Sequence, residues 1–453
     1  MTSAQTCAIR LFSRVAARFL GVAAVLLGDT RSFADEPQTR GIERAGRAAD
    51  EVARSFANAL TFVPRQFIDY AFRGSELAAI LITDRQLVPR YRDLLSRPNA
   101  DLLFFPTLFA ETGSPVSVGA RMVFDSPHLA ANQRIGFGGK DQVESESRLI
   151  FKGHLGRLPS ILSLETHYLL QDNLQFYGVG LVPRSDARNH FVQRSAHEVG
   201  YYTEQRTRAL ASGGVRLSET VELLVSSSLC RRALSNSVAR GESAIHAVFD
   251  EGSVFESGSP ASFVSYSEFA ARYDSRAVRT RPSPGLQLEA YFGGARPLGD
   301  DGTAFVRFGA RASGSVPVYR SHNILAVRLA VDTVVAEKTP SLPFVELVHF
   351  PEFRGFDTRR DMVGFLGSLD YTWSLVPALG MRLFVDALSV APSLEDIGFT
   401  QLIKMRFAGG VGIDGFAGAT PLARLSLSAS SDGMRVIASF GSTQNYGDRQ
   451  HRQ

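Results

Sequence analysis

The chain has 453 residues, a formal net charge of +4, 44% hydrophobic residues and 21% charged residues. This balance excludes a disordered chain, and the lack of any run of eighteen apolar residues excludes a protein that crosses a membrane with helices. No Lys/Arg block or basic helix is present, so a nucleic-acid partner is not expected. The 40 Gly and 32 Phe suit strands and tight turns.

The first 34 residues are predicted to form a secretory signal peptide. Three Arg residues between positions 10 and 18 give a basic start, residues 19–28 an apolar centre, and Ser32-Phe33-Ala34 a small-residue cleavage site. An apolar run of about ten residues is too short to span a bilayer core, which needs about twenty. Cleavage would remove Cys7, so Cys230 would have no disulfide partner and is interpreted as a small strand residue.

Residues 35–100 are predicted to form a mostly helical periplasmic or plug-like segment. Apolar residues recur every three or four positions between Ile42 and Leu60, and Pro64 ends this helical pattern. The apolar face is rich in Ala, which suits packing at the periplasmic mouth more than anchoring on a membrane surface.

From residue 101 onward the period of the hydrophobic pattern changes to two. In the clearest strand, Asn323 to Val334, one face carries Leu325, Val327, Leu329 and Val331. We assign Asn323, Arg328 and Asp332 to the other face. Similar alternation recurs in residues 306–311, 406–413, 424–429 and 435–440, and such segments of about ten residues are typical of outer-membrane barrels.

A soluble β-sandwich would alternate as well, but many strands without disulfides or covering helices would leave long sheet edges. Closure into a barrel removes those edges, and a lipid environment demands the same closure. We therefore predict an all-β, antiparallel transmembrane barrel of about 16 strands over residues 101–441, followed by a polar tail at 442–453. The expected location is the bacterial outer membrane.

Several motifs in the second half of the chain follow one another in a set order. They are Phe353-Arg354-Gly355-Phe356-Asp357, Asp370-Tyr371, Phe384-Val385-Asp386, the Gly-rich residues 406–412 and the closing residues 435–440. In order and spacing they resemble the BamA/TamA-like bacterial surface antigen barrels, as does the Phe-Tyr-Gly-x-Gly element at residues 176–180. Trp373, Ser374 and Leu388 depart from the family pattern.

The resemblance implies a site inside the barrel. Arg354, Gly355 and Phe356 would form a loop motif that folds into the lumen, with Asp386 and Phe384 as its bracing partners and Asp370-Tyr371 as a strand motif. A guanidinium in a lumen of fixed shape pairs best with a carboxylate, through planar charge-assisted hydrogen bonds. We therefore predict a contact between Arg354 and Asp386. The alternative is that Arg354 is solvated on an extracellular loop.

Well-known members of this family insert or thread other membrane proteins with the help of periplasmic POTRA domains. Residues 35–100 leave room for less than one such domain, so the resemblance implies a reduced member, or a partner that supplies the periplasmic receptor. The expected partners are outer-membrane lipid and either a periplasmic protein or an unfolded client protein.

No catalytic signature is present, because the chain contains neither G-x-S-x-G nor H-E-x-x-H. His190 and His197 would lie on opposite faces of a strand, so no metal site, no cofactor and no enzyme activity are expected. Two functions stay open: a factor for protein or lipid insertion or translocation, and a passive porin or structural surface antigen.

Overall fold

The computed structural model describes residues 102–440, apart from gaps at 113–115, 139–141, 193–197, 238–242, 250–260, 277–282, 300–302, 319, 338–341, 357–358, 377–378, 397–403 and 418–419. The predicted signal peptide, the predicted helical segment of residues 35–100 and the polar tail lie outside the described residues.

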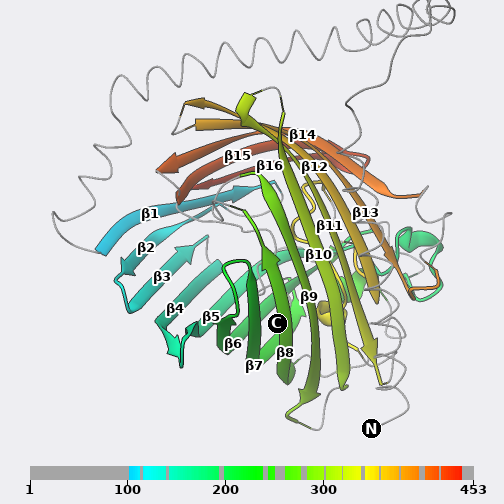
Figure 1. Cartoon of the computed structure of the whole chain (residues 1–453). Coiled ribbons are helices and arrows are strands. Elements are labelled where there is room, and N and C mark those ends of the chain that lie inside the picture. The colour runs from blue at the N-terminus through cyan, green and yellow to red at the C-terminus, as the bar shows by residue number, and fades with distance from the viewer. Residues whose placement is uncertain are drawn as a thin grey trace, which may run out of the picture. The chain divides into compact units, whose positions relative to one another are not determined.

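Sixteen antiparallel strands form a closed barrel (Figure 1). The strands are β1 (Leu102–Glu111), β2 (Ser117–Asp125), β3 (Leu129–Phe137), β4 (Gln142–Leu155), β5 (Leu158–Phe176), β6 (Gly200–Arg216), β7 (Val221–Asn236), β8 (Ala261–Asp274), β9 (Gly285–Pro297), β10 (Phe305–Val318), β11 (Arg320–Ala336), β12 (Val363–Val376), β13 (Leu379–Ala391), β14 (Arg406–Ala417), β15 (Thr420–Ser430) and β16 (Gly433–Phe440). Each strand pairs with its neighbours in sequence, and β1 pairs with β16 to close the ring. The prediction of an all-β barrel of about 16 strands is confirmed.

Helical structure among the described residues is confined to the connections between strands. It consists of the short helix α4 (Ile245–Val248) and the 3₁₀ turns η1 (Pro183–Ser185) and η4 (Phe344–Glu346). None of these described helices has the length and apolar character that a membrane crossing requires.

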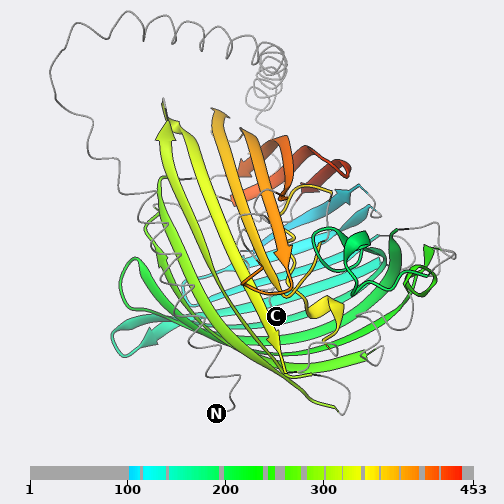
Figure 2. The same cartoon turned by 90° about the vertical axis from the view of Figure 1, so that its right-hand side faces the viewer.

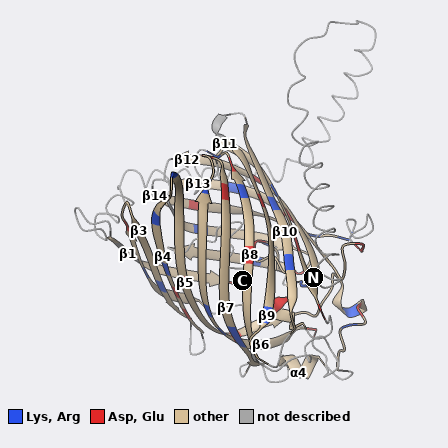
Figure 3. Cartoon of the chain, turned by 60° about the horizontal axis from the view of Figure 1, so that its bottom comes forward, with Lys and Arg blue, Asp and Glu red and all other residues tan. Residues whose placement is uncertain are grey.

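The alternation of side chains gives the barrel an apolar outside and an ionic inside. On β11, Val327 points outward and is 41% exposed, whereas Arg328 points inward and pairs with Asp370. Figure 3 shows positive and negative residues interspersed along the strands. The assignment of Asn323 to the inner face is wrong: it shares the outer face with Leu325, because strand side chains alternate, and donates to the Tyr371 hydroxyl at 3.1 Å.

The two ends of the barrel differ in their connections. One end, the loop end, carries the long connections at residues 177–199, 237–260, 337–362 and 392–405. The other end, the turn end, carries mostly short turns such as 156–157 and 217–220, together with the start of β1 and the end of β16. The connection 337–362 joins β11 to β12, and Figure 2 shows its described part, in yellow, inside the ring of strands. We call it the lumen loop.

An apolar core fills the loop end of the barrel. Three connections supply it, with Val179 and Leu181 from the first, Ile245 and Val248 from the second, and eight residues of the lumen loop. These eight are Leu342, Phe344, Val345, Leu347, Val348, Phe350, Phe353 and Met362, each at most 7% exposed. Inward side chains of the wall, among them Val334, Leu366 and Leu388, complete the core. Burial of this much apolar surface stabilises the loops within the lumen.

Candidate functional site

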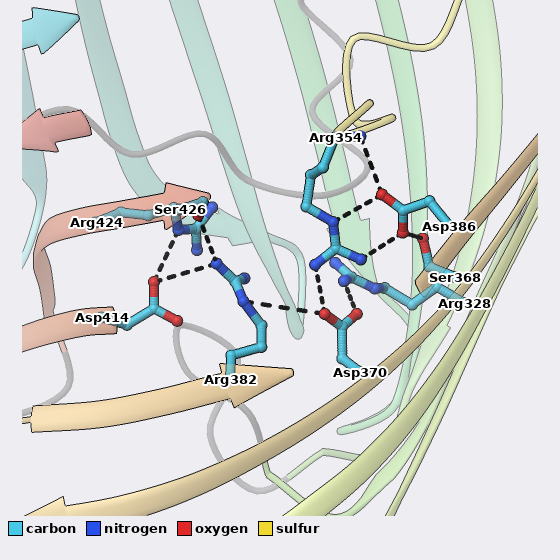
Figure 4. A network of polar contacts seen from close by, with 9 residues as sticks. All are labelled: Arg328, Arg354, Ser368, Asp370, Arg382, Asp386, Asp414, Arg424 and Ser426. Atoms are coloured by element: carbon cyan, nitrogen blue, oxygen red, sulfur yellow. Dashed lines mark hydrogen bonds and ion pairs between the residues drawn. The ribbon is translucent and has the colours of Figure 1, made fainter. Parts of the chain in front are cut away.

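Arg354 lies at the centre of the candidate site (Figure 4). Its backbone N and its Nε both donate to Asp386 Oδ2, at 3.0 and 2.8 Å, and its Nη2 donates to Asp386 Oδ1. Its Nη1 donates to Asp370, and its guanidinium carbon lies 3.8 Å from the centre of the Phe384 ring. Arg354 is 9% exposed and Asp386 is completely buried. The structure therefore contains the predicted Arg354 to Asp386 contact, and the alternative of a solvated Arg354 is wrong.

The strand sequences explain why the acceptors converge on Arg354. Asp370 and Asp386 occupy inward positions of the neighbouring strands β12 and β13, and Phe384 is the register partner of Asp370. One guanidinium can therefore reach both carboxylates and stack on the ring between them. Such planar, bidentate, charge-assisted contacts favour Arg over Lys.

Gly355 permits a close approach between the lumen loop and the wall. A Cβ atom at this position would lie 2.4 Å from the Phe353 ring and 2.9 Å from Ala408 Cβ. Phe356 lies next to the wall of β15, where its backbone N donates to Ser430 Oγ at 3.3 Å. Tyr371 is separated from this site, because it points outward and packs beside Trp373, with ring centres 5.5 Å apart.

A wider ionic network surrounds this centre, and the sequence did not predict its pairings. Asp370 also accepts from Arg328, Ser368 Oγ donates to Asp386 at 2.6 Å, and Arg382 lies 3.5 Å from Asp414. Figure 4 shows that these groups form a chain of alternating charge from β11 to β15. Strand alternation predicts that these side chains point inward. It does not predict which of them pair, because the pairs depend on the register of neighbouring strands.

Strands β7 and β10 also hold the lumen loop. Arg232 of β7 donates to the Val345 carbonyl at 3.0 Å and pairs with Glu346 at 3.1 Å. Arg311 of β10 pairs with Glu352 at 3.3 Å. The loop thus has ionic anchors on β7 and β10 as well as on β12 and β13, which restrict its movement more than its apolar packing alone would.

A second connection covers the lumen loop at the loop end. In the Phe-Tyr-Gly-x-Gly element, Gly178 and Gly180 adopt φ values of +93° and +86°, which favour Gly. This backbone lets Gly180 N donate to the Arg360 carbonyl at 3.0 Å. Arg188 then donates to both carboxylate oxygens of Asp361, at 2.8 and 2.7 Å, and also to Asp186.

The two carboxylates that accept from Arg188 have pKa values shifted in opposite directions. Burial raises the pKa of Asp361 above its usual range, against the opposing effect of Arg188. Burial also acts on Asp186, but hydrogen bonds from Arg188 outweigh it and hold the pKa of Asp186 below its usual range. Acidification therefore neutralises Asp361 before Asp186.

Within the described ranges, no three His, Cys, Asp or Glu side chains are grouped closely enough to hold a metal ion. His197, one of the two histidines considered from the sequence, lies outside those ranges. Cys230 is buried on β7 and forms no disulfide with any residue that the structure describes.

The fold, a closed 16-stranded barrel with a long connection inside its lumen, is similar to the barrel fold of BamA. No family model and no curated protein sequence matches the chain. Among solved structures, BamA from Haemophilus ducreyi lacking POTRA domains 1–3 has a TM-score of 0.51 at 13% identity, covering 76% of this chain and 71% of that chain. At this identity the likeness is one of fold.

Two further solved structures are similar to a lesser degree. CdiB from Acinetobacter baumannii has a TM-score of 0.45 at 10% identity, covering 75% of this chain and 59% of that chain. CdiB from Escherichia coli has a TM-score of 0.44 at 9% identity, covering 76% of this chain and 64% of that chain. The chain therefore spans less than two thirds of either CdiB chain.

Proposed function

We propose that the protein is an outer-membrane barrel that assists the insertion of proteins or lipids into that membrane, or their translocation across it, without enzymatic chemistry. The observation that carries the proposal is the lumen loop, which Arg354 holds against Asp386 and Asp370. This ion-paired segment of the loop is buried inside the barrel and occupies space that an open water column would need.

The outward side chains support a membrane location. Leu164, Val225, Leu229 and Phe269 are between 44% and 58% exposed on the outer face. Buried carboxylates follow or precede two of these residues on the inner face: Glu165 beside Leu164 and Glu268 beside Phe269. Glu165 pairs with Arg148 at 2.8 Å. An apolar outside around a polar inside is the pattern of transmembrane barrels, so membrane lipid is the first expected partner.

The filled loop end argues against the passive porin. A porin needs a continuous polar channel, but the described connections bury an apolar core across the lumen. The contact of Arg188 with Asp361 joins two of these connections. A structural surface antigen without transport remains the alternative function.

The closing seam of the barrel supports movement. Four Cα pairs, from Leu108↔Phe440 to Glu111↔Ile437, join β1 to β16. Eight pairs join β1 to β2, and eight join β15 to β16. Among the described residues, β1 and β16 each form fewer pairs across the seam than with their other neighbour. Fewer hydrogen bonds therefore need to break for β1 and β16 to part than for either to leave its other neighbour.

The proposed clients are unfolded membrane proteins, delivered with or without a periplasmic partner, as the resemblance to BamA/TamA-like barrels implies. Such a client would pass from the turn end, where the chain enters β1, toward lipid at the seam. The lumen loop would hold the barrel in its resting form while no client is present.

Reconstituted vesicles test this proposal. We expect vesicles that contain the protein to take up a urea-unfolded outer-membrane barrel protein at least several-fold faster than empty vesicles, measured as the protease-resistant folded fraction. Arg354→Ala should reduce this gain, and the exposed loop variant Arg184→Ala should keep it. Equal rates with and without the protein would contradict the proposal and favour the structural surface antigen.

A further inference from the structure

Arg435 of β16 joins three parts of the barrel through one guanidinium. Its Nε donates to Glu111 Oε1 of β1 at 2.9 Å, and its Nη2 donates to the same oxygen. Its Nη1 donates to the carbonyl oxygens of Phe353 and Gly355, each at 2.9 Å. The side chain thus links the last strand to the first strand and to the lumen loop on either side of Arg354.

The contact between Arg435 and Glu111 lies at one end of the seam. Glu111 and Arg435 are largely buried, with side chains 22% and 14% exposed. Glu111 belongs to the last of the four Cα pairs of the seam. Beyond it, only Thr112 continues the seam among the described residues, through its backbone hydrogen bond to the Val436 carbonyl at 3.1 Å. The ion pair therefore holds the loop end of the shortest strand pairing among the described residues.

The lumen loop determines the orientation of Arg435. The two carbonyls that accept from its Nη1 flank Arg354, which is fixed by Asp386 and Asp370. Ser428 Oγ donates to the Arg354 carbonyl, so β15 holds the same short stretch of backbone. If the loop moved, Arg435 would lose two acceptors, and its planar fork would no longer be fixed toward Glu111.

We infer that Arg435 couples the seam to the lumen loop, so that release of the loop loosens the β1 to β16 pairing and opening of the seam loosens the loop. This inference rests on the proposed function, in which the seam parts. Coupling of this kind is reciprocal, because both contacts share one side chain and one equilibrium. Arg435 is a positioning residue in this account, and a loop displacement caused by a client would reach the seam through it.

A cross-linking cycle tests the inference without any client. Ala110 and Ala438 are register partners across the seam. Both are replaced by Cys in a chain whose Cys7 and Cys230 are replaced by Ser, and the rate of disulfide formation reports seam closure. We expect Arg354→Ala, which touches neither β1 nor β16, to slow this rate about fivefold or more. In the Arg435→Ala background, Arg354→Ala should have little further effect.

Two controls separate coupling from general damage. Glu111→Gln should slow cross-linking and, because the coupling is reciprocal, make the lumen loop more accessible to protease. In the Arg435→Ala background it should have little further effect on either measurement. Arg435→Lys should behave between the wild type and Arg435→Ala, since Lys keeps the charge but lacks the fork. It also replaces Arg435→Ala in the cycle if that variant does not fold.

The outcomes of the cycle are distinct from those of the vesicle assay. Equal slowing by Arg354→Ala in both backgrounds would overturn the coupling, even if the protein inserts clients. Non-additive slowing in a protein that inserts no client would support the coupling and contradict the proposed function.

Discussion

Arg354→Ala is expected to lower the free energy of unfolding by about 3–5 kcal/mol, because it leaves a buried carboxylate without its partner. Asp386 is completely buried and accepts three hydrogen bonds from Arg354, two of them from the guanidinium. Asp370 keeps Arg328 as a partner in the variant, so Asp386 accounts for most of the loss. The loop would also lose its stacking on Phe384.

Urea titration in phospholipid vesicles measures this loss. The chain has one Trp, Trp373, which is 5% exposed and lies on β12 three residues after Asp370, so its fluorescence reports unfolding beside the site. Arg354→Lys should lose less stability, because it keeps a charge near Asp386, and Arg184→Ala should be neutral. A loss below about 0.5 kcal/mol for Arg354→Ala, the range of ordinary surface changes, would show that the loop is held without this contact.

Leu229→Arg is expected to destabilise the folded barrel in a bilayer by about 2–4 kcal/mol, the cost of an Arg that faces lipid near the bilayer midplane. Leu229 lies near the middle of β7, points outward and is 47% exposed. In a protein surrounded by water, an exposed position of this kind would accept Arg at almost no cost.

The matched control is Leu229→Ala, which removes the apolar side chain without adding a charge. The difference between the two variants in urea titration isolates the cost of the charge in lipid. The same destabilisation by both variants, or none by either, would contradict the placement of this face against the membrane.

Sequence reasoning succeeded where one physical period controls the structure. The period of two placed Arg328 inside and Val327 outside. The need to close the sheet edges predicted a barrel in place of a soluble sandwich. The Arg354 to Asp386 contact was predicted because an inward carboxylate on a strand after the loop motif was the natural partner for a buried guanidinium. Asn323 was assigned to the wrong face because its polarity was given more weight than its place in the strand. It lies two residues before Leu325, so the two side chains share one face.

Contacts between distant segments could not be predicted in the same way. Arg188 pairs with Asp361 across 173 positions, and Arg435 with Glu111 across 324. Alternation gives the face of each side chain, but such partners depend on the stagger of sixteen strands and on the path of the loops. The apolar core at the loop end was missed because its connections have no period, although Phe344 and Phe350 are unusually apolar for loop positions.

Single-channel conductance in a planar bilayer tests most directly whether the lumen loop closes a membrane barrel. The account predicts a small, flickering conductance for the wild type, because the apolar core and the ionic anchors of the loop obstruct the lumen. Arg354→Ala should raise the conductance or make it unstable, and Arg184→Ala should leave it unchanged. A large, steady conductance in the wild type that Arg354→Ala does not alter would mean an open pore and would contradict the account.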